Sequence, residues 1–325
     1  QVGGRKRFLF HFEQKIVTFV PAWQALRALR EVPTRGIVLR PLRLRNNSQS
    51  AMNAILPLFV RWDVNPTMIS IGSFEIRYYG LMWALALGIS AYIFSHIIKR
   101  EGYPDKLFDS IFWYGVLSTI IGARLGHCLF YDPGYYLTHP VEILYIHQGG
   151  LASHGAAVGL LVGLWLFSRK NKMPYIWSLD RIAIAVGIAG ALVRIGNLMN
   201  SEIYGHATSL PWGFVFVRAG ETQPMHPTQI YEAAAYLVLF GILCWMYYGP
   251  KLALRRPGLM FGFFLIYLFG FRFLVEFIKN PQEEFERTMT LNMGQWLSIP
   301  FIVLGIVILY RACRRPAVEP PKTKR

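Results

Sequence analysis

Two pairs of polar side chains fall near the ends of apolar segments, where they could hold a phosphate. Arg194 and Asn197 are three residues apart, and Arg272 and Glu276 are four apart, so each pair shares one face of a helix. An arginine guanidinium stays charged and can grip phosphate oxygens in a fork geometry. The spacing therefore predicts a phosphate clamp. Arg272 and Glu276 could equally form an ion pair that holds the helix, and Arg124 has the same two interpretations.

One histidine is a candidate general base for a reaction at this clamp. His154 stands between Ser153 and Gly155, whose small side chains leave room for a ligand. An imidazole titrates near neutrality and can accept a proton. A lone histidine in such a position is more often a simple hydrogen-bond partner, but the two candidate clamps beside it favour the catalytic interpretation.

A second histidine, His226, begins a different pattern. Pro227 follows it, and Glu232 would then lie within an early helical turn. Proline is common in the first turn of a helix. A structural N-terminal cap is therefore favoured over catalysis for His226.

Metal and thiol chemistry are not predicted. The three cysteines, Cys128, Cys244 and Cys313, form no C-x-x-C pair, and the remaining histidines have no partner at metal-ligand spacing. We expect Cys128 and Cys244 to be packing residues. The sequence thus indicates no metal site and no diffusible cofactor.

The composition indicates that membrane-spanning helices position these side chains. Of 325 residues, 54% are apolar and 16% are charged, whereas soluble domains are about 45–50% apolar and about 25% charged. A transmembrane helix needs about 20 residues, and seven apolar stretches approach or reach that length, the third and seventh being short. They are 81–98, 111–130, 150–167, 182–199, 230–248, 259–278 and 296–310.

The connections between these stretches alternate in their content of Lys and Arg. From residue 52 to the C-terminus, the eight connecting and terminal segments hold 2, 3, 0, 4, 1, 3, 2 and 6. Segments rich in Lys and Arg stay in the cytoplasm. The sequence therefore predicts an all-α integral membrane protein of about seven transmembrane helices, with the N-terminus of the membrane domain outside and the C-terminus cytoplasmic. Extracytoplasmic loops at about 131–149, 200–229 and 279–295 would form a small head.

In this orientation, six of the seven spans bring unusual polar residues to the outer leaflet. Charged residues within spans are costly and usually functional, so we predict a polar cavity there, walled by hydrocarbon. A substrate with a charged head and apolar tails would match it. A secondary transporter is the main alternative, but no internal repeat is visible and the polar residues avoid the midplane. A lipid-binding protein without catalysis is also possible, and replacing His154 would distinguish it from an enzyme.

Both ends of the chain are basic. Residues 52–310 form the predicted membrane domain, 311–325 a basic cytoplasmic tail, and 1–51 a basic N-terminal extension. The segment MNAILPLFV at 52–60 resembles a true start, so 1–51 is added sequence, an upstream extension or a weakly ordered arm. With equal weight, Leu26, Leu29, Arg27 and Arg30 could form an interfacial amphipathic helix. Basic ends most often contact anionic lipids, and no nucleic-acid-binding module accompanies the charge.

Seven motifs in order resemble the prolipoprotein diacylglyceryl transferase family, over most of 68–310. One motif alone would be a weak signal, whereas their common order is specific. The motifs are YYGLMW (78–83), GARLGHCLFY (122–131), GGLASHGA (149–156), RIGNLMNSEIYG (194–205), HPTQIYEA (226–233), FRFLVEFIKNPQ (271–282) and MGQWLSIP (293–300).

The resemblance implies a reaction and its partners. The family transfers an sn-1,2-diacylglyceryl group from phosphatidylglycerol to the lipobox cysteine thiol of a prolipoprotein, next to its signal peptide. The products are a thioether and glycerol-1-phosphate, and this is the first step of bacterial lipoprotein maturation. The resemblance also implies a multi-pass protein of the bacterial cytoplasmic (inner) membrane, with its active site toward the outer leaflet.

The resemblance also implies roles for particular residues. Arg194 and Arg272 would hold the lipid phosphate, His154 would deprotonate or orient the thiol, and Tyr79 would bond near the reaction centre. The headgroup would further be bound by Asn197, Asn200, Glu202, Gly205, Arg124 and Glu276. Supporting roles fall to His226, Gln229, Tyr231, Glu232 and Tyr267.

Two positions depart from the family pattern. The family usually has a tyrosine four residues before the arginine of its FRxxVEF motif, whereas this chain has Leu268 there and Tyr267 one step away. An acidic residue often precedes the two glycines before the histidine, and here that residue is Gln148. We expect these departures to bear on specificity more than on the reaction.

Overall fold

The computed structural model describes residues 59–72, 74–130, 133–145, 150, 152–280 and 289–317. The expectations for residues 1–51, for Gln148 and for most of the C-terminal tail lie outside this part of the chain. The same holds for parts of the predicted loops at 131–149 and 279–295.

Within the described residues, seven long helices coincide with the seven apolar stretches. They are α3 (Tyr78–Arg100), α4 (Asp105–Phe130), α6 (Ser153–Asn171), α7 (Tyr175–Met199), α8 (Thr228–Tyr248), α10 (Leu259–Val275) and α11 (Met293–Arg314). The helices at the third and seventh stretches are longer than expected, at 19 and 22 residues. Both run on through basic residues at their C-terminal ends, where positive side chains complement the helix dipole and have good helix propensity.

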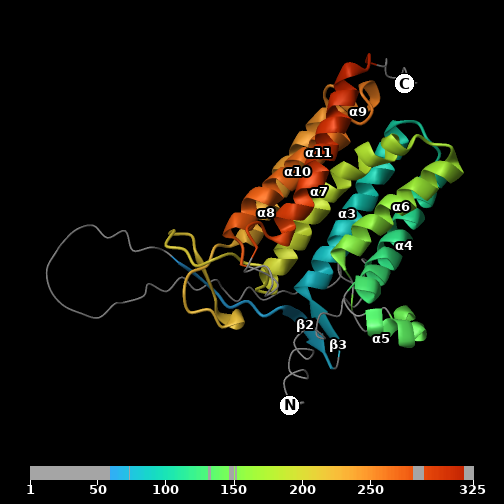
Figure 1. The fold of residues 1–325 in the computed structure, drawn as a ribbon. Coiled ribbons are helices and arrows are strands. Elements are labelled where there is room, and N and C mark those ends of the chain that lie inside the picture. Colours follow the sequence, from blue (N-terminus) through green and yellow to red (C-terminus); the bar gives the residue numbers. More distant parts are fainter. Residues whose placement is uncertain are drawn as a thin grey trace, which may run out of the picture.

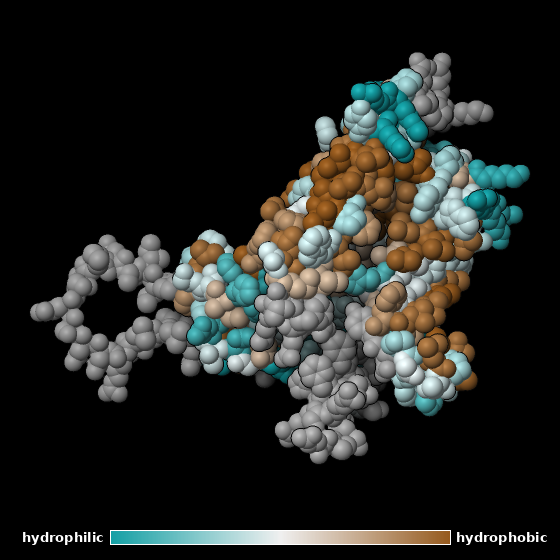
Figure 2. Space-filling model, in the orientation of Figure 1, coloured by the Kyte–Doolittle hydropathy of each residue, from teal (hydrophilic) through white to brown (hydrophobic). Residues whose placement is uncertain are grey.

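Five of these helical segments, among the described residues, are long and apolar enough to cross a membrane. They are α3, α7, α8, α11 and the run Leu259–Ile278, which joins α10 to the short helix η4 (Glu276–Ile278). Figure 2 shows an apolar surface along the bundle between hydrophilic ends. The chain is thus a mostly helical integral membrane protein.

The long helices lie side by side, with small elements gathered at one end (Figure 1). Helix α4 packs chiefly on α6, α10 on α11, and α7 on both α3 and α8. The main apolar core lies between these helices and includes Ile97, Leu164, Ile184, Leu239 and Met260, all of them fully buried or nearly so. At the opposite end of the bundle lie α9 (Leu252–Arg255) and the C-terminal end of α11.

Helices α4 and α6 meet through glycines whose backbones touch. A methyl group at Gly122 would lie against the carbonyl oxygen of Gly155 and 2.6 Å from the Gly159 Cα. At Gly115, two turns earlier on the same helix, the nearest heavy atom would be 3.8 Å distant, on Leu160. Close backbone approach through small residues is a common way for membrane helices to associate.

This contrast gives a matched pair of variants. Gly122→Ala should destabilise the protein by about 1–3 kcal/mol, because neither backbone can retreat without separating the helices. Gly115→Ala should be neutral or slightly stabilising, since alanine is the better helix former and has room. Thermal unfolding of both variants in detergent would test this, and equal melting temperatures would contradict it.

The all-α expectation needs one correction, because the described part of the chain contains four short strands beside the helices. β1 (Val60–Trp62) pairs in parallel with β4 (Phe214–Phe216), and β2 (Thr67–Ile71) pairs antiparallel with β3 (Phe74–Arg77). The partners of the first pair are about 150 residues apart, so no local pattern in the sequence could indicate it. The Trp62 indole also donates to the Leu198 carbonyl at 3.0 Å, which ties the segment before α3 to the end of α7.

Short helices fill the remaining connections. α5 (Pro133–Thr138) and η1 (Pro140–Leu144) lie in the predicted 131–149 loop, and η3 (Val217–Ala219) follows β4. The segment between α7 and α8 forms a small core with the end of α7, in which Phe216 and Met225 are buried together with Leu198 of α7. This segment lies within the predicted loop 200–229 and is called the head below. A small extracytoplasmic head formed by three loops stays a prediction.

The end of the bundle away from the head contains a buried ion pair. Arg181, counted above among loop charges, is 1% exposed and pairs with Glu101 at 2.9 Å. The Glu101 carboxylate also accepts from the Trp177 indole at 2.7 Å and from the Tyr247 hydroxyl at 2.8 Å. Three helices, α3, α7 and α8, are thereby joined at this end.

Candidate functional site

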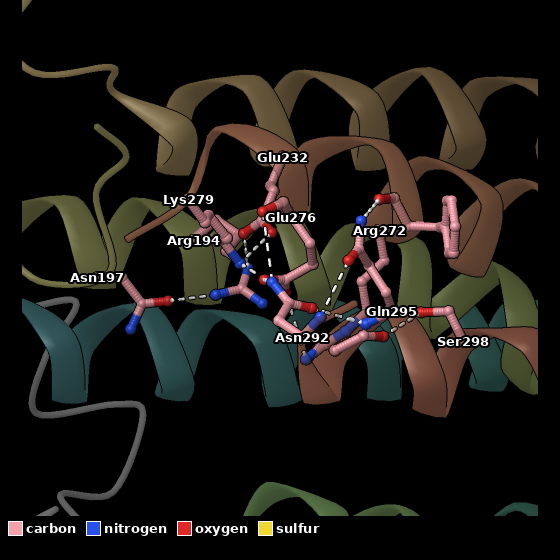
Figure 3. A network of polar contacts seen from close by, with 11 residues as sticks. Arg194, Asn197, Glu232, Arg272, Glu276, Lys279, Asn292, Gln295 and Ser298 are labelled. Atoms are coloured by element: carbon pink, nitrogen blue, oxygen red, sulfur yellow. Dashed lines mark hydrogen bonds and ion pairs between the residues drawn. The ribbon is translucent and has the colours of Figure 1, made fainter. Parts of the chain in front are cut away.

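The C-terminal end of α7 places Arg194 in a polar cluster (Figure 3). Its Nε lies 2.5 Å from the Glu232 carboxylate of α8, and its Nη1 donates to the Asn197 side chain at 3.3 Å. The buried Tyr236 hydroxyl, one turn after Glu232, is a further partner of the guanidinium. The predicted i, i+3 pairing of Arg194 with Asn197 is therefore present in the structure.

The chain that follows α7 folds back onto this cluster through Glu202. Its carboxylate accepts from Asn197 at 2.8 Å and from Asn200 at 3.4 Å. The buried Gln229 side chain donates to the Glu202 carbonyl at 2.6 Å. The residues of the RxGNxxNxE motif are thus bonded mainly to one another and to the first turn of α8.

Arg272 and Glu276, on α10 and η4, form the second half of the cluster. Their closest charged atoms are 3.7 Å apart, so the ion pair allowed by their spacing exists. The Arg272 side chain nevertheless stays 28% exposed, whereas that of Glu276 is 7% exposed. The pair leaves donors of Arg272 accessible to a ligand, so both interpretations of the sequence are compatible with the geometry.

Sequence reasoning missed Asn292 and Gln295, which anchor α11 to this cluster. Asn292 donates to the Glu276 carboxylate at 3.1 Å and forms a capping box with Gln295. Gln295 also donates to the Phe273 carbonyl at 3.3 Å. A signal was present, because asparagine followed three residues later by glutamine before an apolar run is typical of a helix start.

Sequence reasoning also missed Lys279, which had been counted as an outer loop charge. Its Nζ lies 2.7 Å from Glu232 and 3.5 Å from Glu276, and its side chain is 2% exposed. Gly205 forms a backbone bridge to Lys279, and a side chain at Gly205 would collide with the Ile278 carbonyl oxygen. The close passage of the segment that carries Lys279 therefore leaves no room for a side chain at position 205, and headgroup binding by Gly205 stays a prediction.

Tyr79 and His154 lie at the edge of the cluster. The Tyr79 ring packs against the backbone of Gly196 and acts electrostatically on Arg194. His154 is the second residue of α6 and is exposed, with Arg272 as the charged group that acts on it. Both positions adjoin the arginines, as expected, although catalytic roles stay predictions.

Arg124 belongs to a different group of contacts. It is 4% exposed, and its guanidinium donates to the carbonyls of Ile143 at 2.8 Å and Glu142 at 2.6 Å. It also donates to the Gly150 carbonyl at 3.3 Å and lies over the Tyr136 ring. These contacts tie α4 to η1 and to the chain just before α6, so a phosphate contact by Arg124 stays a prediction.

His226 and Tyr231 face the head. The Tyr231 hydroxyl is within 3.3 Å of His226 Nδ1 and accepts from the Trp212 indole at 2.9 Å. Burial, with a smaller contribution from His206, lowers the pKa of His226. The expected N-terminal cap is wrong in detail, because Pro227 is the N-cap residue of α8 and no side chain caps that helix.

Tyr267 belongs to α10 and packs against the apolar core. The centre of its ring is 6.0 Å from that of Phe263. Within the described residues, its hydroxyl makes no hydrogen bond to the cluster. A replacement of the family tyrosine by Tyr267 therefore stays untested.

The cluster as a whole suits a ligand that carries a phosphate. Arg194 and Arg272 are 15% and 28% exposed, whereas the two carboxylates beside them are 1% and 7% exposed. The accessible groups are thus the cationic ones, and the anions lie behind them. Guanidinium donors in a partly desolvated site bind phosphate strongly. No group of three or more His, Cys, Asp or Glu residues that could hold a metal occurs in the part of the chain that the structure describes.

Comparison with known proteins gives a consistent result. Residues 66–311 match the family model described as prolipoprotein diacylglyceryl transferase. A phosphatidylglycerol–prolipoprotein diacylglyceryl transferase of Bacteroides fragilis is 45% identical over 281 residues, covering 82% of this chain and 100% of the relative. Proteins of the same name from Porphyromonas gingivalis and Chloroherpeton thalassium are 43% and 38% identical, covering 81% and 80% of this chain and 98% and 97% of the relatives.

Proposed function

The chain belongs to the prolipoprotein diacylglyceryl transferase family, and we propose that the arginine cluster between α7, α8 and α10 is where it carries out that family's reaction. It is a transferase that acts on phosphatidylglycerol and prolipoprotein, as the names of its relatives state. The observation that carries the proposed location is the pair of partly exposed arginines, Arg194 and Arg272, backed by buried carboxylates.

The chemistry makes this arrangement useful. The substrate thiolate attacks the glycerol carbon that bears the phosphate, so a carbon–sulfur bond forms while the carbon–oxygen bond to phosphate breaks. Negative charge grows on the departing glycerol-1-phosphate. Preorganised cationic donors aimed at such a group stabilise the transition state. We assign this role to Arg194 and Arg272, with Asn197, Asn200 and Glu202 shaping the space for the headgroup.

His154 would accept the thiol proton at the imidazole nitrogen. A thiol has a pKa of about 8.5 in water, so a nearby base or positive charge raises the thiolate fraction. The position of His154 in the first turn of α6 supports this role, because the positive end of a helix dipole favours both a neutral imidazole and a nearby thiolate. Tyr79 would donate a hydrogen bond beside Arg194.

We further infer that all seven long helices cross the bacterial inner membrane, with the cluster at the outer leaflet. The alternation of Lys and Arg along the connections supports this orientation. The tight packing of α4 on α6 supports placing these more polar helices in the membrane as one unit. Labelling of single cysteines in the head and in the α9 segment by a membrane-impermeant reagent would test it, and labelling from the α9 side in intact cells would contradict it.

The reaction itself is tested by a mass shift. Purified protein in detergent would be incubated with phosphatidylglycerol and a signal peptide that ends in a lipobox cysteine. We expect the peptide to gain the mass of a diacylglyceryl group. No gain, under conditions in which the Bacteroides fragilis relative works, would contradict the proposed function.

His154→Gln separates chemistry from lipid binding in the same assay. We expect kcat to fall by roughly 10²–10⁴-fold, the usual contribution of a general base. The affinity for phosphatidylglycerol should stay within about twofold, because the imidazole does not hold the phosphate. A variant that loses lipid binding and turnover together would show that His154 acts in binding instead.

A further inference from the structure

Lys279 occupies a position that the proposed chemistry does not use directly. Its side chain is 2% exposed, so it does not present a charge to a ligand as Arg272 does at 28%. The ammonium instead lies between the carboxylates of Glu232 and Glu276, at 2.7 and 3.5 Å. A buried lysine in contact with two acids is costly to place and needs both for its own stability.

The five charged side chains form an alternating row across the site (Figure 3). Arg194 contacts Glu232, Glu232 contacts Lys279, Lys279 contacts Glu276, and Glu276 contacts Arg272. Within this row, three cations face two carboxylates, which leaves one positive charge in excess. Each carboxylate is shared between Lys279 and one arginine, so Lys279 competes with both arginines for their counter-ions.

We propose that Lys279 is a positioning residue that neutralises Glu232 and Glu276 from behind, and so keeps the charge of Arg194 and Arg272 available to the lipid phosphate. The inference rests on the proposed function of the cluster. Without the ammonium, two buried carboxylates would face two arginines, and the row would carry no net charge. Each arginine would then be drawn to its own carboxylate, and a phosphate would meet a neutral site.

The backbone around Lys279 is built to hold it in place. Gly205 and Lys279 form an antiparallel bridge, His206 donates to the Ile278 carbonyl at 2.9 Å, and the Asn280 side chain donates to the Gly205 carbonyl at 3.1 Å. The lysine is thus fixed by the head segment and not only by its ion pairs. A rigid support of this kind is what a charge needs if it is to orient other side chains without moving itself.

Three variants test the proposal, namely Lys279→Met, Lys279→Arg and the double variant Lys279→Met with Glu276→Gln. We expect Lys279→Met to raise the KM for phosphatidylglycerol by roughly 10- to 100-fold, the range for one charge-assisted interaction, with a smaller change in kcat. Lys279→Arg should restore most of the affinity because it restores the charge. The double variant again has one positive charge in excess, and we expect its KM to fall back toward that of the parent protein.

Equilibrium binding of phosphatidylglycerol, measured by native mass spectrometry, gives a second readout that does not depend on turnover. A double variant that binds no better than folded Lys279→Met would overturn the proposal, as would an unchanged KM in Lys279→Met. If Lys279→Met does not fold, the double variant is the test. A folded double variant that no longer binds phosphatidylglycerol would contradict a charge-balancing role for Lys279. If the parent protein binds the lipid but transfers nothing, the proposed function fails while the binding comparison still tests Lys279.

Discussion

Arg194→Ala is expected to lower kcat/KM for diacylglyceryl transfer by roughly 10²–10³-fold, the usual cost of removing a preorganised donor from a developing charge. Arg194 belongs to the cluster, and Glu232 at 2.5 Å and Asn197 at 3.3 Å orient its guanidinium. The substitution removes both the proposed phosphate donor and the partner of a carboxylate that is 1% exposed. The transfer assay with a lipobox peptide measures the effect.

Two further variants identify the cause. Arg194→Lys keeps the charge but lacks the planar fork, so we expect it to recover only part of the activity. Arg218→Ala removes an exposed arginine of η3 and should leave transfer within about twofold, as expected of exposed surface positions. If Arg194→Ala keeps more than about a third of kcat/KM while folded, Arg194 does not hold the leaving phosphate.

Glu101→Ala is expected to destabilise the protein by about 3–5 kcal/mol, the typical cost of breaking a buried ion pair from one side. The substitution leaves the Arg181 guanidinium, which is 1% exposed, without its carboxylate partner. It also removes the hydrogen-bond acceptor of the Trp177 indole and of the Tyr247 hydroxyl. Because these residues lie on α7, on α8 and at the C-terminal end of α3, helix packing at this end of the bundle should loosen. Chemical or thermal unfolding in detergent measures the loss.

The matched control is an exposed pair of the same type. Glu75 and Arg77 lie 3.3 Å apart, but their side chains are 46% and 39% exposed, so Glu75→Ala should cost no more than about 1 kcal/mol. The double variant Glu101→Leu with Arg181→Met should be more stable than Glu101→Ala, since it leaves no unpaired buried charge. Equal losses for Glu101→Ala and Glu75→Ala would show that burial of the pair does not decide its contribution.

The helices could be predicted because hydropathy is a local property. Each of the seven apolar stretches contains a long helix, and the differences are at the ends. The largest are N-terminal, where α7 and α4 begin at Tyr175 and Asp105, before the apolar runs that start at 182 and 111. The spacing rules also worked within single helices. Arg194 with Asn197, and Arg272 with Glu276, make the contacts that three- and four-residue separations allow.

The second half of the site could not be predicted in the same way, because its contacts join residues that are far apart in the chain. The pairing of Lys279 with Glu232 crosses from the end of η4 to α8, and Asn292 reaches Glu276 from the start of α11. A lysine in a connecting segment looks the same in the sequence whether it is solvated or buried. Arg181 illustrates this at the other end of the bundle, where it was counted as a loop charge and is buried.

The sequence by itself determined that this protein is a helical membrane protein of the diacylglyceryl transferase family, and it indicated which arginines to examine. The reason is that the length of each apolar stretch and the order of the motifs are properties of the sequence alone. Only the tertiary structure decided which of the polar residues meet. It brought Lys279, Asn292 and Gln295 into the cluster, and it placed Arg124, His226 and Tyr231 in other groups of contacts. The physical reason is that the role of a buried charge depends on its neighbours in space, and packing of helices, not spacing in the sequence, chooses those neighbours.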